Sequence, residues 1–238
     1  MSFDFTAFLL LYICVGIAIG YFIDDFALLT KSFGGLYKSN AIASNLGSII
    51  YLVNRVFIAM TLPALGFIID SGVEIDVIVI TLIVSSLLLV FFKILAYSKI
   101  FKIILLLKWF AEKIYGKNEY QINDDRLIQI QISSKTDLRA SIAMFMFISS
   151  MTIPSILAVI YFDNRGFFLQ LGFAFNMVGS LIKILFIERE IAVKAEQLVH
   201  KKISSEQFMF AIATVLRSRI IGTIIFAAFL FLFLFFYI

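Results

Sequence analysis

The sequence has almost no cysteine or histidine: Cys14 and His200 are the single residues of their kinds among 238. One cysteine excludes a disulfide framework within the chain, and one histidine beside it argues against a metal centre built from these ligands. We expect Cys14 to be a small packing residue in an apolar helix. The sequence therefore predicts no metal ion and no cofactor.

Charged residues and catalytic motifs are also scarce. Only 15% of the residues are charged, whereas soluble globular domains have about 25%. No Gly-rich phosphate loop with its lysine is present, which excludes a P-loop ATPase. The paired acids of "IDDF" (23–26) and "INDDR" (122–126) lack a second acidic cluster at Mg²⁺-binding spacing, which weakens a polyprenyl or phosphatidyl transferase. We expect a protein that is not an enzyme.

What the chain does have is long apolar runs. Hydrophobic residues make up 62% of it, and runs long enough to cross a hydrocarbon core of about 30 Å recur. These runs predict an all-α, polytopic helical membrane protein with a single transmembrane domain, 1–238. The first run has no Lys or Arg before it and is too long for a signal-peptide core, so we expect it to remain as a helix. The six predicted spans are 4–23, 40–69, 75–95, 139–161, 166–187 and 208–238.

The segment between spans three and four, 96–138, is the sizeable part predicted outside the bilayer. The stretch "SKIFKIILLLKWFAEKIYGK" mixes lysines with apolar residues and one Trp, which is typical of an amphipathic helix on an anionic leaflet. The stretch "NEYQINDDRLIQIQISSKTD" is polar, and its "LIQIQIS" run fits a short strand or part of a helix equally well. Within the second span, Pro63 and Gly66 predict a bend or a break.

Lysine and arginine predict the orientation. Segments 24–39, 93–139 and 183–207, which share one side of the membrane, hold most of them, whereas "DSGVEID" on the other side is purely acidic. By the positive-inside rule, both termini face away from the cytoplasm. This topology accounts for the net charge of +4, and we expect no nucleic-acid partner. Six spans also divide into two sets of three, which would be inverted relative to each other, as in many transporters.

Two spans carry polar stripes at helical spacing. In span two, Ser44, Ser48, Tyr51 and Arg55 share one face of a helix, with Asn54 beside them. In span five, the stripe consists of Gly172, Asn176, Ser180 and Lys183. Such stripes either glue helices together or line a hydrated cavity, and for the serines and glycines the first interpretation has more weight.

Arg55 favours the second interpretation, because an ionised side chain in mid-bilayer costs about 2.5–3.5 kcal/mol even on the lenient insertion scale. Lys183, Arg217 and Arg219 lie near the cytoplasmic ends of their spans, where they either snorkel to the interface or converge with Arg55. If they converge, they form a cationic surface whose natural ligand is an anion, and arginine binds phosphate in a bidentate fork. The candidate binding residues are Arg55, Lys183, Arg217, Arg219, Ser48, Tyr51, Asn54 and Asn176.

The stretches "FIDDFALLTKSFGG" and "SNLGSIIYLVNRVFIAMTLPALGFIID" resemble the Amj family of bacterial lipid II flippases. That family has Ile-Asp at the end of the first span, a basic residue seven positions later and then a Gly. It also has an arginine in span two followed by Pro-x-x-Gly-x-x-x-Asp, and a basic residue before Gly-Thr near the end. The matching residues here are Asp24, Lys31, Gly34, Arg55, Pro63, Gly66, Asp70, Arg219, Gly222 and Thr223. Lys31 stands where arginine is typical, and the middle of the chain matches in hydropathy only.

The resemblance implies a protein of the bacterial plasma membrane that moves an undecaprenyl-pyrophosphate-linked glycan, lipid II in peptidoglycan synthesis, from the inner to the outer leaflet. A divergent member would carry a surface-polysaccharide repeat unit instead. The implied partners are the polyprenyl-pyrophosphate-linked glycan and membrane lipids. Arg55 would hold the pyrophosphate, the other three cations would receive it, and Asp24 or Asp70 would pair with an arginine in the empty site.

Three other functions stay open at this point. A secondary transporter of a small anion would use the same cations. A membrane partner that recruits an enzyme would depend on the basic segment 93–139 rather than on Arg55. A membrane enzyme is third, because metal-binding and nucleophile constellations are missing.

Overall fold

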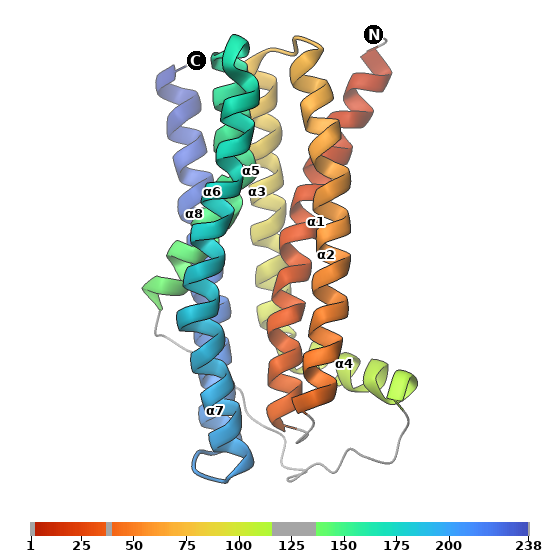
Figure 1. Cartoon of the computed structure of the whole chain (residues 1–238), viewed down its shortest axis with the longest axis vertical. Coiled ribbons are helices and arrows are strands. Elements are labelled where there is room, and N and C mark those ends of the chain that lie inside the picture. The colour runs from red at the N-terminus through yellow and green to blue at the C-terminus, as the bar shows by residue number, and fades with distance from the viewer. Residues whose placement is uncertain (1–2, 37–39, 116–136, 238) are drawn as a thin grey trace.

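The computed structural model describes residues 3–36, 40–115 and 137–237, and within them the structure is helical throughout (Figure 1). Short connections join α5 to α6 through a 3₁₀ turn at Phe162–Asn164, and a π-helical segment, Lys183–Glu188, joins α6 to α7. The helices are α1 Phe3–Leu36, α2 Asn40–Asp70, α3 Ile75–Ser98, α4 Ile100–Tyr115, α5 Leu138–Ile160, α6 Arg165–Ile182, α7 Arg189–Val199 and α8 Ser205–Tyr237. The run "LIQIQIS" lies outside the described residues.

The predicted all-α membrane fold is confirmed. Over the described part of the chain, six helical segments are long and apolar enough to cross a bilayer: 5–30, 41–70, 75–98, 138–160, 162–199 and 205–237. The predicted amphipathic segment forms α4, which runs across the end of the bundle instead of along it (Figure 1). We call this the α4 end. The first residues of α1 and the last of α8 lie at the opposite end, the far end.

Two predicted boundaries are wrong. The first span was expected to end at residue 23, with a loop over 24–39, but α1 continues as one helix to Leu36. The apparent end was marked by Asp24 and Asp25, which are buried inside the bundle rather than exposed beyond it. Of the bend or break predicted at Pro63 and Gly66, the break is absent, because α2 is continuous from Asn40 to Asp70. Pro63 lies on an exposed face of that helix.

The two halves of the chain pack in the same pattern. In the first half, α1 contacts both α2 and α3, and in the second half α5 contacts both α6 and α8. The third helices of the halves, α3 and α8, pack against each other and join them. Because α1 runs from the far end towards the α4 end and α5 runs the opposite way (Figure 1), the halves are inverted relative to each other.

The apolar core consists of two clusters stacked along the bundle axis. On α1, Tyr21 belongs to the far cluster and Leu28 to the α4-end cluster. On α8, Phe226 belongs to the far cluster and Leu216 to the α4-end cluster. Charged side chains occupy the level between the clusters, so the core is divided by a polar layer.

Glycines let the helices of the second half approach each other closely. A side chain at Gly222 on α8 would overlap the backbone carbonyl of Ser141 on α5. Ser141 also donates its hydroxyl hydrogen to the Ser218 carbonyl at 2.8 Å, so α5 and α8 are joined by backbone-level contacts there. Small residues at such crossings allow helices in membranes to pack without bulky side chains between them.

We predict that Gly222→Ala destabilises the protein, because the added methyl group meets a backbone atom that cannot rotate away. Overpacking of this kind costs about 1–3 kcal/mol. Thermal unfolding in detergent, followed by loss of monodisperse protein, measures the effect. Gly66→Ala is the matched control, since nothing lies within 4 Å of a Cβ at Gly66. Equal stability of the two variants would contradict this account of the crossing.

Candidate anion-binding cavity

Five charged side chains form the polar layer between the two clusters. We call them the ion layer: Asp24 and Asp25 from α1, Lys93 from α3, Lys183 from the π-helical segment and Arg219 from α8. Lys93 Nζ lies 2.5 Å from Asp25 Oδ2, and Lys183 Nζ lies 2.7 Å from Asp24 Oδ1. Arg219 bridges the acids, contacting Asp24 with Nη2 and lying 2.8 Å from Asp25 Oδ1 with Nη1.

The ion layer is buried, since none of its five side chains is more than 11% exposed. It contains three cations and two carboxylates, so each acid has a cationic partner, and Glu188 beside Lys183 supplies a third carboxylate. Buried charges are tolerated when each has a partner with good geometry, whereas an unpaired one is strongly destabilising. The contacts join α1 to α3, to α8 and to the continuous helical stretch made of α6, the π-helical segment and α7, which we call the α6–α7 rod.

The π-helical segment places Lys183 and Glu188 together. In an α-helix, residues five apart point to different sides, whereas a π turn pairs residue i with i+5. Lys183 Nζ accordingly lies 3.7 Å from Glu188 Oε1. Lys183 thus has a carboxylate on its own helix as well as Asp24 across the bundle, and it is held at the wall of a cavity.

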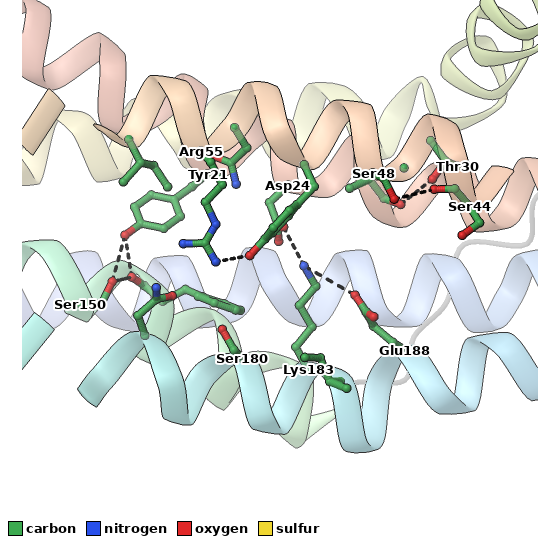
Figure 2. Close-up of a pocket in the computed structure, with 18 of the residues that line it drawn as sticks. Tyr21, Asp24, Thr30, Ser44, Ser48, Arg55, Ser150, Ser180, Lys183 and Glu188 are labelled. Carbon is green, nitrogen blue, oxygen red and sulfur yellow. Dashed lines mark hydrogen bonds and ion pairs between the residues drawn. The ribbon is translucent and has the colours of Figure 1, made fainter. Parts of the chain in front are cut away.

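That cavity has a volume of about 470 Å³ and lies between the α1–α2 pair and the α5–α6 pair (Figure 2). Its size falls in the range of small-molecule binding sites. Nearly all of its charged and hydrogen-bonding groups come from α1, α2 and the α6–α7 rod. The residues that line it are Tyr21, Asp24, Ala27, Thr30, Ala43, Ser44, Gly47, Ser48, Tyr51, Asn54, Arg55, Ile58, Phe147, Ser150, Met151, Asn176, Ser180, Lys183, Ile184 and Glu188.

Arg55 enters the cavity from the middle of α2 and differs from the cations of the ion layer. Its guanidinium donates to the Tyr51 hydroxyl and lies 4.8 Å from the centre of the Tyr51 ring. Among the described residues, no carboxylate forms an ion pair with it. The Tyr51 contact joins residues four apart on one helix, so it aims Arg55 without neutralising it. Arg55 is therefore a cation at mid-span whose charge is available to a ligand.

Neutral hydrogen-bonding groups flank these charges along the cavity. Ser48 donates to the Ser44 carbonyl at 3.0 Å, and Thr30 donates to the Ala27 carbonyl at 2.7 Å, on the side towards the α4 end (Figure 2). Asn54 is 5% exposed, and its Oδ1 accepts no hydrogen bond from the described residues. A buried amide oxygen without a partner is uncommon and costs free energy unless a ligand or water satisfies it.

The cavity does not extend to the far end. Its lining ends at Tyr21, whose hydroxyl donates to the Phe147 carbonyl of α5 at 2.6 Å. Beyond that contact, Asp70 at the end of α2 lies 3.3 Å from Arg165 Nη1 at the start of α6. These two contacts join the facing helix pairs on the far-end side of the cavity, whereas Thr30, Ser44 and Ser48 line its side towards the α4 end.

The structure brings most of the predicted site residues together. The cavity is lined by Arg55, Lys183, Ser48, Tyr51, Asn54, Asn176 and Asp24. Arg219 lies behind Asp24 in the ion layer rather than on the wall. Arg217 is half-buried and lines no cavity; two residues from Arg219, it points to the other side of α8.

Four further residues on which the resemblance rests do not line the cavity. Gly34 is buried near the end of α1, Pro63 and Gly66 lie further along α2, and Asp70 forms the far-end pair with Arg165. The side chain of Lys31 lies outside the described residues.

Sequence reasoning missed Asp25 and Lys93 as members of one site. Lys93 was counted with the lysines of the segment 93–139, although it is 2% exposed inside α3. The available signal was a lone lysine inside an apolar run, with sixteen uncharged residues before it (77–92) and five after it (94–98). That signal is weak because lysines also snorkel at helix ends. Comparisons with protein-family models, curated proteins and solved structures found no match.

We predict that Asp25→Asn costs about 3–5 kcal/mol of stability, because it leaves Lys93 buried without its carboxylate. The double variant Asp25→Asn/Lys93→Met removes both members of the pair and is expected to recover most of that loss. Thermal unfolding of the wild type, both single variants and the double variant forms the cycle that measures the coupling. Additive effects of the two substitutions would contradict a direct pair.

Proposed function

We propose that this chain is a flippase that moves a polyprenyl-pyrophosphate-linked glycan across the bacterial plasma membrane. The observation that carries the proposal is Arg55: a cation at the centre of a membrane-spanning helix that faces a cavity and has no carboxylate partner among the described residues. Keeping such a charge in hydrocarbon is expensive. Binding of an anionic substrate accounts for an arginine at this position.

The charges of the cavity suit a pyrophosphate. Arg55 offers a planar fork that binds two phosphate oxygens at once, and Lys183 on the opposite wall offers a second, point-like charge. In the empty cavity Lys183 is held by Asp24 and Glu188. The Asp24 carboxylate thus takes the position beside Lys183 that a bound anion would take. A pyrophosphate carries more negative charge than one carboxylate and competes with Asp24 for Lys183, whereas a monovalent anion would gain little.

The shape of the cavity supports a lipid-linked cargo. It lies between two helix pairs that cross the membrane, so a headgroup inside it can keep its polyprenyl tail in the surrounding lipid. The hydroxyl and amide groups of Thr30, Ser48, Asn176 and Ser180 provide partners for sugar hydroxyls beside the phosphates. A volume of about 470 Å³ accommodates the pyrophosphate and the sugar next to it, while a larger glycan extends towards the open side.

The resemblance to the Amj family names lipid II, and hence peptidoglycan synthesis, as the first cargo to test. A surface-polysaccharide repeat unit on the same carrier offers the same pyrophosphate. In this proposal the α4 end faces the cytoplasm and both termini face outward. The inverted halves suit alternating access, in which one helix pair moves against the other around a fixed site. The protein acts as a transporter and not as an enzyme.

A second candidate is a secondary transporter of a small anion, which is favoured by the modest volume of the cavity. It would use Arg55 and Lys183 in the same way but would not require a polyprenyl tail. Transport of soluble pyrophosphate into proteoliposomes without polyprenyl lipids would favour this candidate. Transport only of the lipid-linked form favours the flippase.

We predict that Arg55→Ala abolishes flipping while the protein remains folded and inserted. Loss of a charge pair of this kind costs about 2–4 kcal/mol, roughly a 30-fold or greater loss of rate. Arg55→Lys keeps the charge but not the fork, so it should retain partial activity. The assay measures lipid II in the outer leaflet of cells depleted of their own lipid II flippases, with protein levels followed in the membrane fraction.

Arg189→Ala is the matched control, because Arg189 is an exposed arginine at the start of α7 and does not line the cavity. Rescue by the wild type and by this control, but not by Arg55→Ala, supports the proposal. Undiminished rescue by Arg55→Ala would refute the role of the cavity. If neutralising the lysines of 93–139 abolished rescue while Arg55→Ala did not, a role in recruiting a partner would replace transport.

A further inference from the structure

Helix α4 has three distinct sides, only one of which is covered by protein. It follows α3 after a single residue, Lys99, and runs across the end of the bundle (Figure 1). One side packs into the α4-end cluster through residues that are at most 3% exposed. These are Ile100, Ile104, Leu107 and Ala111. The contacts fix the rotation of α4 about its own axis and therefore determine what its other sides face.

The second side of α4 is apolar and exposed. At about 100° per residue, Leu106, Phe110 and Ile114 lie on one flank of the covered side. They are 46%, 44% and 53% exposed. Large apolar side chains next to one another on a surface mark a membrane or protein contact. In a chain with six membrane-crossing helices, acyl chains are the surroundings available at the rim of the bundle.

The third side of α4 is cationic. Lys102 and Lys113 are exposed on it with Trp109 between them, and Lys113 Nζ lies 5.9 Å from the centre of the Trp109 ring. Lys108 lies on the flank of α4 opposite Leu106, Phe110 and Ile114, and it pairs with Glu112 at 3.7 Å. The segment from Lys99 to Tyr115 contains four lysines and one glutamate, so its charge is strongly positive.

The depth of α4 matches the headgroup region. Helix α3 has 24 residues, and at 1.5 Å per residue it is about 36 Å long, slightly more than the hydrocarbon thickness. Helix α4 begins two residues after α3 ends, so it lies at the level where acyl chains meet headgroups. Tryptophan is enriched at this level, and lysines there lie close to lipid phosphates.

From this arrangement we infer that α4 is a binding surface for anionic phospholipid headgroups, with Lys102, Lys108 and Lys113 on the phosphates and Leu106, Phe110 and Ile114 in the acyl chains. The occupant is the bilayer itself, because the cationic side and the apolar side are adjacent and meet at headgroup depth. A soluble protein partner would cover only the cationic side. The inference does not depend on the proposed transport.

The surface also lies beside the cavity. Ala43 of α2 lines the cavity and packs in the same apolar cluster as α4. Anionic lipid held along α4 would therefore lie near the α4-end side of the cavity, at the start of α2. Binding of α4 to the bilayer combines the attraction between its lysines and anionic lipids with the burial of its apolar side.

The chain supplies its own probe for this surface, since Trp109 is the single tryptophan among 238 residues. The protein is reconstituted into vesicles that contain either brominated phosphatidylglycerol or brominated phosphatidylcholine at the same mole fraction. Bromine quenches tryptophan fluorescence only at close contact. We expect quenching by the anionic lipid to exceed that by the zwitterionic lipid roughly twofold or more, and the excess to shrink in high salt.

The test variant is the triple substitution Lys102→Gln, Lys108→Gln and Lys113→Gln, which should remove the preference for anionic lipid and leave quenching by phosphatidylcholine unchanged. The control triple, Arg189→Gln, Lys201→Gln and Lys202→Gln, removes the same charge from exposed positions on α7 and the turn after it. The inference fails if Trp109 is not quenched, if both lipids quench equally in the wild type, or if the preference survives in the α4 triple. It also fails if both triples lose the preference alike.

Discussion

The pairing of Asp24 and Asp25 with three cations is the interaction on which the rest of the structure depends. A carboxylate inside a membrane-crossing helix must be matched by positive charge, and two adjacent carboxylates on α1 require cations from several directions. They receive these cations from α3, from the π-helical segment and from α8. The ion layer thus joins both halves of the protein around α1, with one apolar cluster on each side of it along the bundle axis.

The cavity lies beside the ion layer and contains a cation, Arg55, that the acids of the ion layer do not neutralise. Those acids are engaged, and Arg55 on α2 lies outside that layer, with the Tyr51 hydroxyl and no carboxylate as its partner among the described residues. Lys183 belongs to both the ion layer and the cavity wall, since it pairs with Asp24 and lines the cavity. An anion that enters between Arg55 and Lys183 therefore acts on the ion layer as well as on the cavity wall. This shared lysine gives a transporter a physical link between binding of the substrate and the packing of its helices.

Hydropathy and helical periodicity predicted the membrane class, the number of spans and the polar face of α2, because both depend on local sequence. The same reasoning wrongly ended the first span before Asp24 and wrongly assigned Lys93 to a loop. Without knowledge of its partners, a charge next to an apolar run is interpreted as the edge of the bilayer. The partners that reverse this interpretation are 68, 159 and 195 residues away. The π-helical segment was equally hidden, since "KILFIE" carries no proline or other local signal for it. Arg217 and Arg219 could have been separated beforehand, because residues two apart on a helix point to different sides.

The central claim is that the cavity binds a pyrophosphate in competition with Asp24. The direct measurement is calorimetric titration of the purified protein with farnesyl pyrophosphate, a short polyprenyl pyrophosphate, comparing the wild type with Asp24→Asn and with Asp25→Asn/Lys93→Met. Asp24→Asn removes the internal competitor, so the account predicts binding that is tighter by about tenfold, or about 1.4 kcal/mol. The double variant, which leaves the cavity wall intact, should bind as the wild type does. Unchanged or weaker binding by a folded Asp24→Asn protein would contradict the account.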